Sequence, residues 1–125
     1  MFEIALLPDD QLGPDGQRLG RITIGDFSEL FACYPLAGTI DDLPADWRNA
    51  LARLVAGAAY VALIHDPRFA WFIYRDGDSC FVQQILSPDG SFDWHSTRNT
   101  VTEDGERVSE WTISLADISE FLAAN

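Results

Sequence analysis

Two Asp-Gly dipeptides, each flanked by runs rich in β-branched and aromatic residues, most constrain how this chain can fold. Asp and Gly both tolerate the positive φ angles that a tight two-residue turn requires. Asp76-Gly77 lies between residues 69–74 and 80–86 and predicts a β-hairpin. Asp104-Gly105 predicts a second hairpin, formed by residues 98–102 and 108–113. The sequence therefore favours an antiparallel arrangement of strands in its C-terminal half.

Helical periodicity predicts one main helix over residues 43–58. Its apolar residues form a single stripe, made of Leu43, Trp47, Ala50, Leu51, Leu54, Val55 and Ala58. Acidic residues precede this stretch, Pro44 lies in its first turn and Gly57 lies near its end, as expected for helix boundaries. A short C-terminal helix is predicted over residues 114–123, with Ser114 as its N-cap.

The remaining segments read mainly as strands. The continuously apolar residues 60–64 predict a strand that is buried on both faces. Residues 21–34 are also typical of a strand, and the Gly- and Asp-rich residues 8–20 predict a long turn before it. Within that strand, Glu29 shares a face with apolar residues, so it is either an edge residue or a hydrogen-bonded exception. We expect a single α+β domain over residues 1–125, mostly antiparallel sheet with one main helix and a short C-terminal helix.

The charge balance narrows the classes of partner that the protein can bind. The chain has 20 acidic residues against 8 basic ones, no Lys, and a net charge of −12. Such a domain repels phosphate backbones and anionic membranes, and it suits steering onto a basic partner. An acidic surface also simply keeps many domains soluble, so charge alone does not show that the protein binds a basic partner. No apolar run approaches the roughly 20 residues of a membrane span, and the N-terminus lacks the basic segment of a secretory signal. We therefore expect a cytoplasmic protein, with Cys33 and Cys80 as reduced core residues.

Catalytic and metal-binding patterns are weak. The two histidines, His65 and His95, each have an Asp nearby, but their spacing matches no zinc or hydrolase signature. The chain also lacks a phosphate-binding glycine loop and a nucleophile elbow. We expect no catalytic residue, metal or cofactor, and we interpret both histidines as partly exposed residues at strand ends. A small metal-dependent enzyme that uses both histidines is the less favoured alternative.

Acidic residues gather at the two predicted hairpin turns and are the candidate partner-binding residues: Asp76 and Asp78 at the first, and Glu103, Asp104, Glu106 and Glu110 at the second. If both hairpins belong to the same sheet, the two groups can form one negative patch. The simpler interpretation is that turns are polar and solvated. Trp94 lies in the turn-rich residues 88–96, and we add it as a candidate interface anchor.

Five blocks then follow one another in a recognisable order. They are residues 20–31 (GRITIGDFSELF), 46–54 (DWRNALARL), 74–78 with 81–86 (YRDGD and FVQQIL), 98–111 (RNTVTEDGERVSEW) and 114–118 with 121–122 (SLADI and FL). In order and spacing they resemble the immunity proteins of bacterial contact-dependent growth inhibition systems (CdiI type). The resemblance runs from about Gly20 to the C-terminus.

This resemblance implies a binding protein. Such immunity proteins neutralise a cognate toxin, the C-terminal domain of a large secreted effector, and many of these toxins are nucleases. A nuclease presents a basic groove to its substrate, and a carboxylate-rich surface can occupy that groove. The resemblance brings no shared motif of partner-binding residues, so the candidate residues rest on charge grouping alone. An acidic adaptor or regulator of another basic protein is the alternative.

Overall fold

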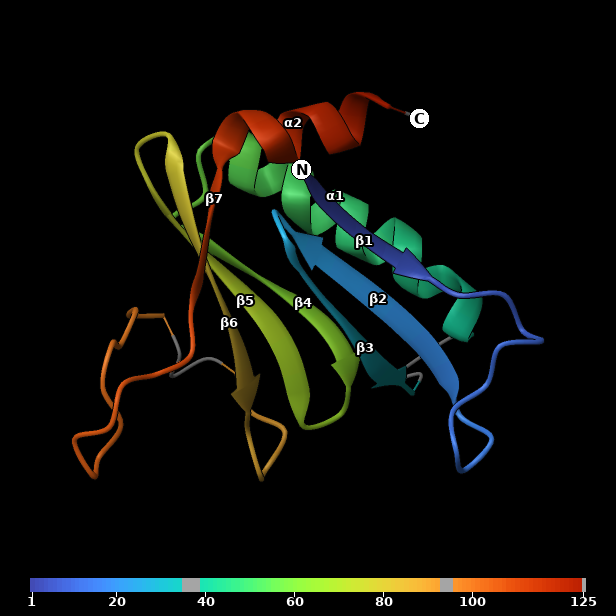
Figure 1. The fold of residues 1–125 in the computed structure, drawn as a ribbon. Coiled ribbons are helices and arrows are strands. Elements are labelled where there is room, and N and C mark those ends of the chain that lie inside the picture. The colour runs from blue at the N-terminus through green and yellow to red at the C-terminus, as the bar shows by residue number, and fades with distance from the viewer. Residues whose placement is uncertain (35–38, 93–95, 125) are drawn as a thin grey trace.

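The computed structural model describes residues 1–34, 39–92 and 96–124. The described residues form two antiparallel sheets and two α-helices (Figure 1). The first sheet contains β1 (Phe2–Leu6), β2 (Arg18–Ile24) and β3 (Phe27–Cys33), in that order. The second contains β4 (Tyr60–Asp66), β5 (Phe69–Asp76), β6 (Ser79–Leu86) and β7 (Trp111–Ser114). The helices are α1 (Leu43–Ala56) and α2 (Leu115–Ala123), and the α+β class is confirmed.

The first sheet divides a segment that the sequence presented as one strand. Gly25 has a φ of 60° and begins a two-residue turn, across which Ile24 pairs with Phe27. A positive φ at the first turn position only is the pattern of a type II′ turn, for which Gly is the usual residue. Within β2, Gly20 lies opposite Phe31, and a Cβ at position 20 would stand 2.5 Å from its ring. Gly20 therefore lets the Phe31 ring lie directly on the neighbouring strand.

The first predicted hairpin is confirmed, with its turn shifted by one residue. Asp76 pairs with Ser79, so the two turn residues are Gly77 and Asp78 rather than Asp76 and Gly77. Gly77 has a φ of 63°, whereas no described residue other than glycine has a positive φ. The turn is thus again of the type II′ pattern, which needs only one residue that tolerates positive φ.

The second predicted hairpin is only partly correct. The chain does turn at Asp104-Gly105, but residues 98–102 form no strand, and a single bridge joins Val101 to Arg107. β7 begins later than predicted, at Trp111, and pairs with β6 instead. The physical reason is that Val101 is exposed, so residues 98–102 have no apolar face with which to hold a strand in place.

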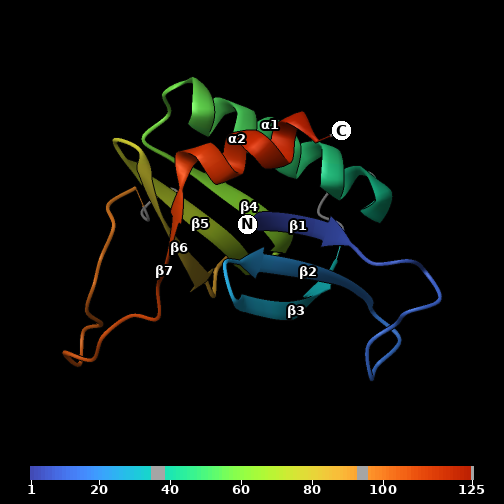
Figure 2. The ribbon, with the colours of Figure 1, turned by 45° about the horizontal axis from the view of Figure 1, so that its top comes forward.

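The helices cover the inner faces of both sheets and contact β1 and β4 (Figure 2). α1 ends at Ala56, two residues earlier than predicted, because Gly57 takes a φ of 128°. The Arg75 guanidinium donates to the Leu54 and Val55 carbonyls at this helix end, at 2.8 and 3.1 Å. The predicted N-cap of α2 is confirmed, since the Ser114 hydroxyl accepts a hydrogen bond from the Asp117 amide.

One core joins both sheets and both helices. Its largest fully buried side chains include Trp47, Trp71, Ile22, Leu51, Leu54, Leu63, Ile73 and Ile118. The Trp47 indole N–H donates to the Ile64 carbonyl at 2.9 Å, which fastens α1 to the edge of β4. Burial in β4 alternates, so residues 60–64 are buried on the core side and half-buried on the other, not fully buried on both faces as predicted. Cys33 and Cys80 are buried and unpaired, as expected, and burial raises the pKa of Cys33 to about 12.

His65 corrects one sequence expectation. Its side chain is only 3% exposed, whereas the sequence suggested a partly exposed strand end. The ring lies beside Phe31, Phe69 and Trp71, and its Nδ1 is 2.9 Å from the Ala32 carbonyl oxygen. The sequence missed this because the first sheet closes over β4 at this point. Burial lowers the pKa of His65, although the Ala32 hydrogen bond and the Asp66 charge oppose the shift.

The free energy of unfolding is expected to fall as the pH drops from about 7 to 5. The pKa of His65 is lower in the folded chain than in the unfolded chain, so stability is lost as the pH falls through the ordinary histidine pKa of 6.5. The slope is at most about 1.4 kcal/mol per pH unit. Urea denaturation of His65→Asn, which keeps a donor toward Ala32, is expected to show a flatter profile. Equal slopes in the wild type and the variant would contradict the assignment.

Candidate functional site

The structure does not gather all of the candidate acidic residues into one patch. The turn with Asp76 and Asp78 lies at the α2 end of the second sheet, where the Leu115 amide donates to the Asp78 carbonyl at 2.8 Å. β7 begins farther along β6, where Trp111 pairs with Val82, and it ends near this turn, where Ser114 pairs with Ser79. The exposed turn with Glu103, Asp104 and Glu106 projects from the opposite end of β7, at the lower left of Figure 1. The acidic residues of the two turns therefore form two separate groups.

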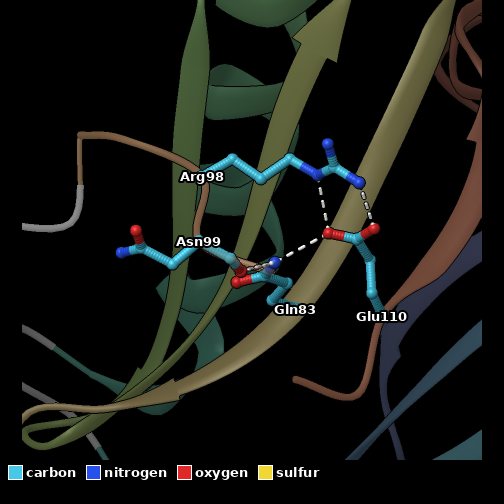
Figure 3. A network of polar contacts seen from close by, with 4 residues as sticks. All are labelled: Gln83, Arg98, Asn99 and Glu110. Atoms are coloured by element: carbon cyan, nitrogen blue, oxygen red, sulfur yellow. Dashed lines mark hydrogen bonds and ion pairs between the residues drawn. The ribbon is translucent and has the colours of Figure 1, made fainter. Parts of the chain in front are cut away.

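Glu110 is engaged in a network of hydrogen bonds within the protein (Figure 3). Its carboxylate accepts a hydrogen bond from Arg98 Nε at 2.7 Å, and its other oxygen forms an ion pair with Arg98 Nη2. The Gln83 side-chain amide donates both to Glu110, at 2.7 Å, and to the Asn99 carbonyl, at 2.9 Å. The Arg98 guanidinium lies 3.8 Å from the centre of the Phe81 ring. The network thus fastens the segment between β6 and β7 to the outer face of the second sheet.

These contacts shift the acidity of the groups involved. The Arg98 and Gln83 hydrogen bonds hold the pKa of Glu110 below its ordinary value, against the effect of its burial. The pKa of Arg98 is raised, first by the Glu110 hydrogen bond and in smaller part by the charges of Glu110 and Asp76. Glu110 acts as an anchor for the segment that carries the second acidic turn.

Glu110→Gln is expected to reduce the free energy of unfolding by about 1 kcal/mol at pH 7. Because the folded pKa of Glu110 is depressed, its contribution is present above the ordinary carboxylate pKa and is lost as the pH falls through the lower, folded value. The difference between wild type and variant, measured by urea denaturation, is therefore expected to shrink below about pH 4. A constant difference from pH 7 to 3 would show that the lost stability is not electrostatic.

The arginines are largely engaged within the fold. Arg75 and Arg48 donate to carbonyls at helix ends, the latter to Leu122 at 2.6 Å. Arg18 donates to the Leu7 carbonyl, and Arg21 forms an ion pair with Glu3. Most acidic side chains, in contrast, are exposed. Arg53, Arg68 and Arg107 are exposed, but they are outnumbered by the exposed carboxylates, which dominate the surface that a partner meets.

The structure adds less about the other candidates that the sequence suggested. Trp94 and His95 lie outside the described residues. Among the described residues, no group of three or more His, Cys, Asp or Glu side chains is arranged to hold a metal ion. Within the same ranges, no helix is long and apolar enough to cross a membrane. Trp111 is half-buried and stacks on Phe27, with ring centres 4.2 Å apart.

The sequence missed a groove beside β3. It has a volume of about 480 Å³ and is lined by Glu29, Leu30, Phe31, Ala32, Tyr34, His65, Asp66, Arg68, Phe69 and Gln84. Glu29 is half-buried, and its carboxylate has no hydrogen bond or ion pair among the described residues. Of its two sequence interpretations, the structure supports the edge residue. An acidic side chain on the apolar face of a strand was the one available signal for this groove.

Comparisons with known proteins agree with the fold. A family model described as the CdiI N-terminal domain matches residues 38–121, which is more than half of the chain. Among solved structures, the "CdiA-CT/CdiI toxin and immunity complex from Enterobacter cloacae" contains a similar chain, with a TM-score of 0.75 and 22% identity. The match covers 99% of this chain and 97% of that chain. No curated protein matches significantly.

Proposed function

The chain belongs to the CdiI family of immunity proteins, and we propose that it binds and neutralises the C-terminal toxin domain of a contact-dependent growth inhibition effector. It acts in the cytoplasm, by binding and without catalysis of its own. The toxin domain is a basic nuclease, and the immunity protein covers its active or substrate-binding surface.

The distribution of charge carries this proposal. The net charge is −12, and five of the eight arginines are engaged with carbonyls or carboxylates of the fold. A nuclease groove is positively charged because it must bind phosphates. A surface of exposed carboxylates is complementary to such a groove, and complementary charge accelerates the encounter of the two proteins. The toxin–immunity complex of the similar chain from Enterobacter cloacae is consistent with this role.

Calorimetric titration with the toxin domain encoded by the adjacent effector gene tests the proposal. We expect a Kd of about 1 nM or below, which rises steeply as NaCl increases, because screening weakens attraction between exposed charges. A toxin domain from an unrelated effector is the control and is expected to bind far more weakly. Absence of binding between two folded proteins would overturn the immunity role and favour an acidic adaptor of another basic protein.

A separate assay tests the nuclease assignment. The toxin domain alone is expected to cleave RNA or DNA, and an equimolar amount of this protein is expected to stop the cleavage. Tight binding to a toxin domain that cleaves neither nucleic acid would leave the immunity role intact and overturn the nuclease assignment.

A further inference from the structure

The outer edge of β3 carries backbone groups that pair with no other strand. Because Ile24 pairs with Phe27 across a two-residue turn, odd-numbered residues of β3 direct their N–H and C=O groups toward β2. Even-numbered residues direct theirs to the other side. Two contacts agree with this: the Tyr34 amide donates to the His65 carbonyl at 2.8 Å, and the Ala32 carbonyl is 2.9 Å from His65 Nδ1.

Farther along the same edge the pairing stops. The backbone N–H and C=O groups of Ser28 and Leu30 face outward, and among the described residues they have no hydrogen-bond partner. A free edge of this kind is a template for one more strand. The contacts at Ala32 and Tyr34 show that this edge already accepts partners where β4 reaches it.

The groove described above runs along this edge. Consecutive strand residues point to opposite faces, so a groove that is lined by every residue from Glu29 to Ala32 must follow the edge of the strand. A second groove of about 390 Å³ continues from it toward Trp111 and shares Glu29 and Gln84 with it. Together they provide an open path beside Glu29 and Leu30, next to the unpaired part of the β3 edge.

The chemistry of the path suits a bound segment with apolar side chains and one basic side chain at Glu29, since Arg68 and Arg107 also line the path at other points. Leu30 and Tyr34, which line it, are 53% and 42% exposed, although large hydrophobic side chains are usually covered. The unpartnered carboxylate of Glu29 offers a site for a basic side chain. His65, which also lines the path, has a buried Nε2 with no hydrogen-bond partner among the described residues.

The other strand edges are less available. β1 lies beneath both helices and contacts each of them (Figure 2). The outer edge of β4 is occupied at Ile64 by the Trp47 indole. β7 has four residues, which makes it a short template. β3 therefore presents the most accessible pairing edge in the described part of the chain.

We propose that an extended segment of the toxin domain pairs with β3 at Ser28 and Leu30, as an added antiparallel or parallel strand, and places a basic side chain against Glu29. This inference rests on the proposed function. A second copy of this chain is the other conceivable occupant of a free edge, but two chains with a charge of −12 each repel one another. A basic partner is attracted instead, so charge complementarity selects the toxin.

Amide hydrogen exchange, followed by NMR on the wild-type protein, tests the pairing directly. We expect the Ser28 and Leu30 amides to exchange rapidly in the free protein and about a hundredfold or more slowly in the toxin complex. Rapid exchange at both positions in a saturated complex would overturn the inference while leaving the immunity role standing. Slow exchange without toxin, in a chain that elutes as a dimer, would assign the edge to a second copy and also overturn it.

Leu30→Pro tests the edge by mutation. Proline removes an N–H that does not bond to β2, so the hairpin is retained, whereas an incoming strand loses a donor and meets the ring. We expect Kd to rise about tenfold or more, against a smaller rise for the matched control Leu30→Ala. Ser28→Pro is the second variant if Leu30→Pro fails to fold. Folded proline variants with wild-type Kd would contradict the proposed pairing.

Discussion

Replacing Glu103, Asp104 and Glu106 by Lys is expected to slow association with the toxin domain about ten- to hundredfold at low salt. The triple substitution removes three negative charges and adds three positive ones, which changes the net charge from −12 to −6. All three side chains are exposed on the turn that projects beyond β7, so the change removes attraction without disturbing the core. Stopped-flow association rates at several NaCl concentrations measure the effect, and the salt dependence is expected to weaken with the rate.

A matched control separates the effect of this turn on the association rate from the effect of the overall charge. Asp9, Asp10 and Asp15 are also exposed, and they lie between β1 and β2. Their replacement by Lys makes the same change in net charge at a different place, and we expect a smaller loss of rate. Equal losses in the two triple variants would mean that the whole field of the protein steers the toxin. Unchanged rates in the first variant would remove the turn from the interface.

Trp47→Ala is expected to reduce the free energy of unfolding by about 3–5 kcal/mol. Trp47 is fully buried between α1 and the second sheet, and its indole donates to the Ile64 carbonyl at 2.9 Å. The substitution leaves a cavity and an unpaired backbone carbonyl. Since domains of this kind are stable by only about 5–15 kcal/mol, the variant loses a large part of its stability.

Trp47→Phe divides this effect into its parts. It retains most of the buried ring volume and removes the indole donor, so we expect a loss of about 1–2 kcal/mol. Urea denaturation of both variants, followed by circular dichroism, gives the two values. A loss below about 1 kcal/mol for Trp47→Ala would show that α1 can close over the missing side chain.

The elements that could be predicted from the sequence are those with a strong local signal. The apolar stripe of α1 and the Ser114 cap of α2 specify these helices by contacts within a few turns. Gly77 specifies the β5–β6 turn, although the neighbouring Asp suggested a register shifted by one residue. The hairpin at Asp104-Gly105 shows the limit, because a good turn does not make strands of flanking residues that bury nothing.

The candidate site was harder to predict than the secondary structure, because it depends on contacts between residues that are distant in the sequence. Glu110 looked like one more exposed acid in sequence, but Arg98 and Gln83 reach it from 12 and 27 residues away. His65 is covered by a strand of the other sheet, and the sequence pattern around His65 does not predict this burial. The backbone groups of Ser28 and Leu30 are unpaired because alternate residues of β3 bond to β2, and side-chain patterns do not show which residues these are.

The placement of charge also bears on how such a protein can evolve. The arginines at the helix ends and the Arg98–Glu110 pair support the scaffold, whereas Glu103, Asp104 and Glu106 are exposed and form no ion pair among the described residues. Substitutions in that turn therefore cost little folding free energy, since surface positions away from such contacts tolerate change. Under the proposed role of this turn in toxin binding, a lineage can revise its partner preference through these positions and inherit the fold unaltered.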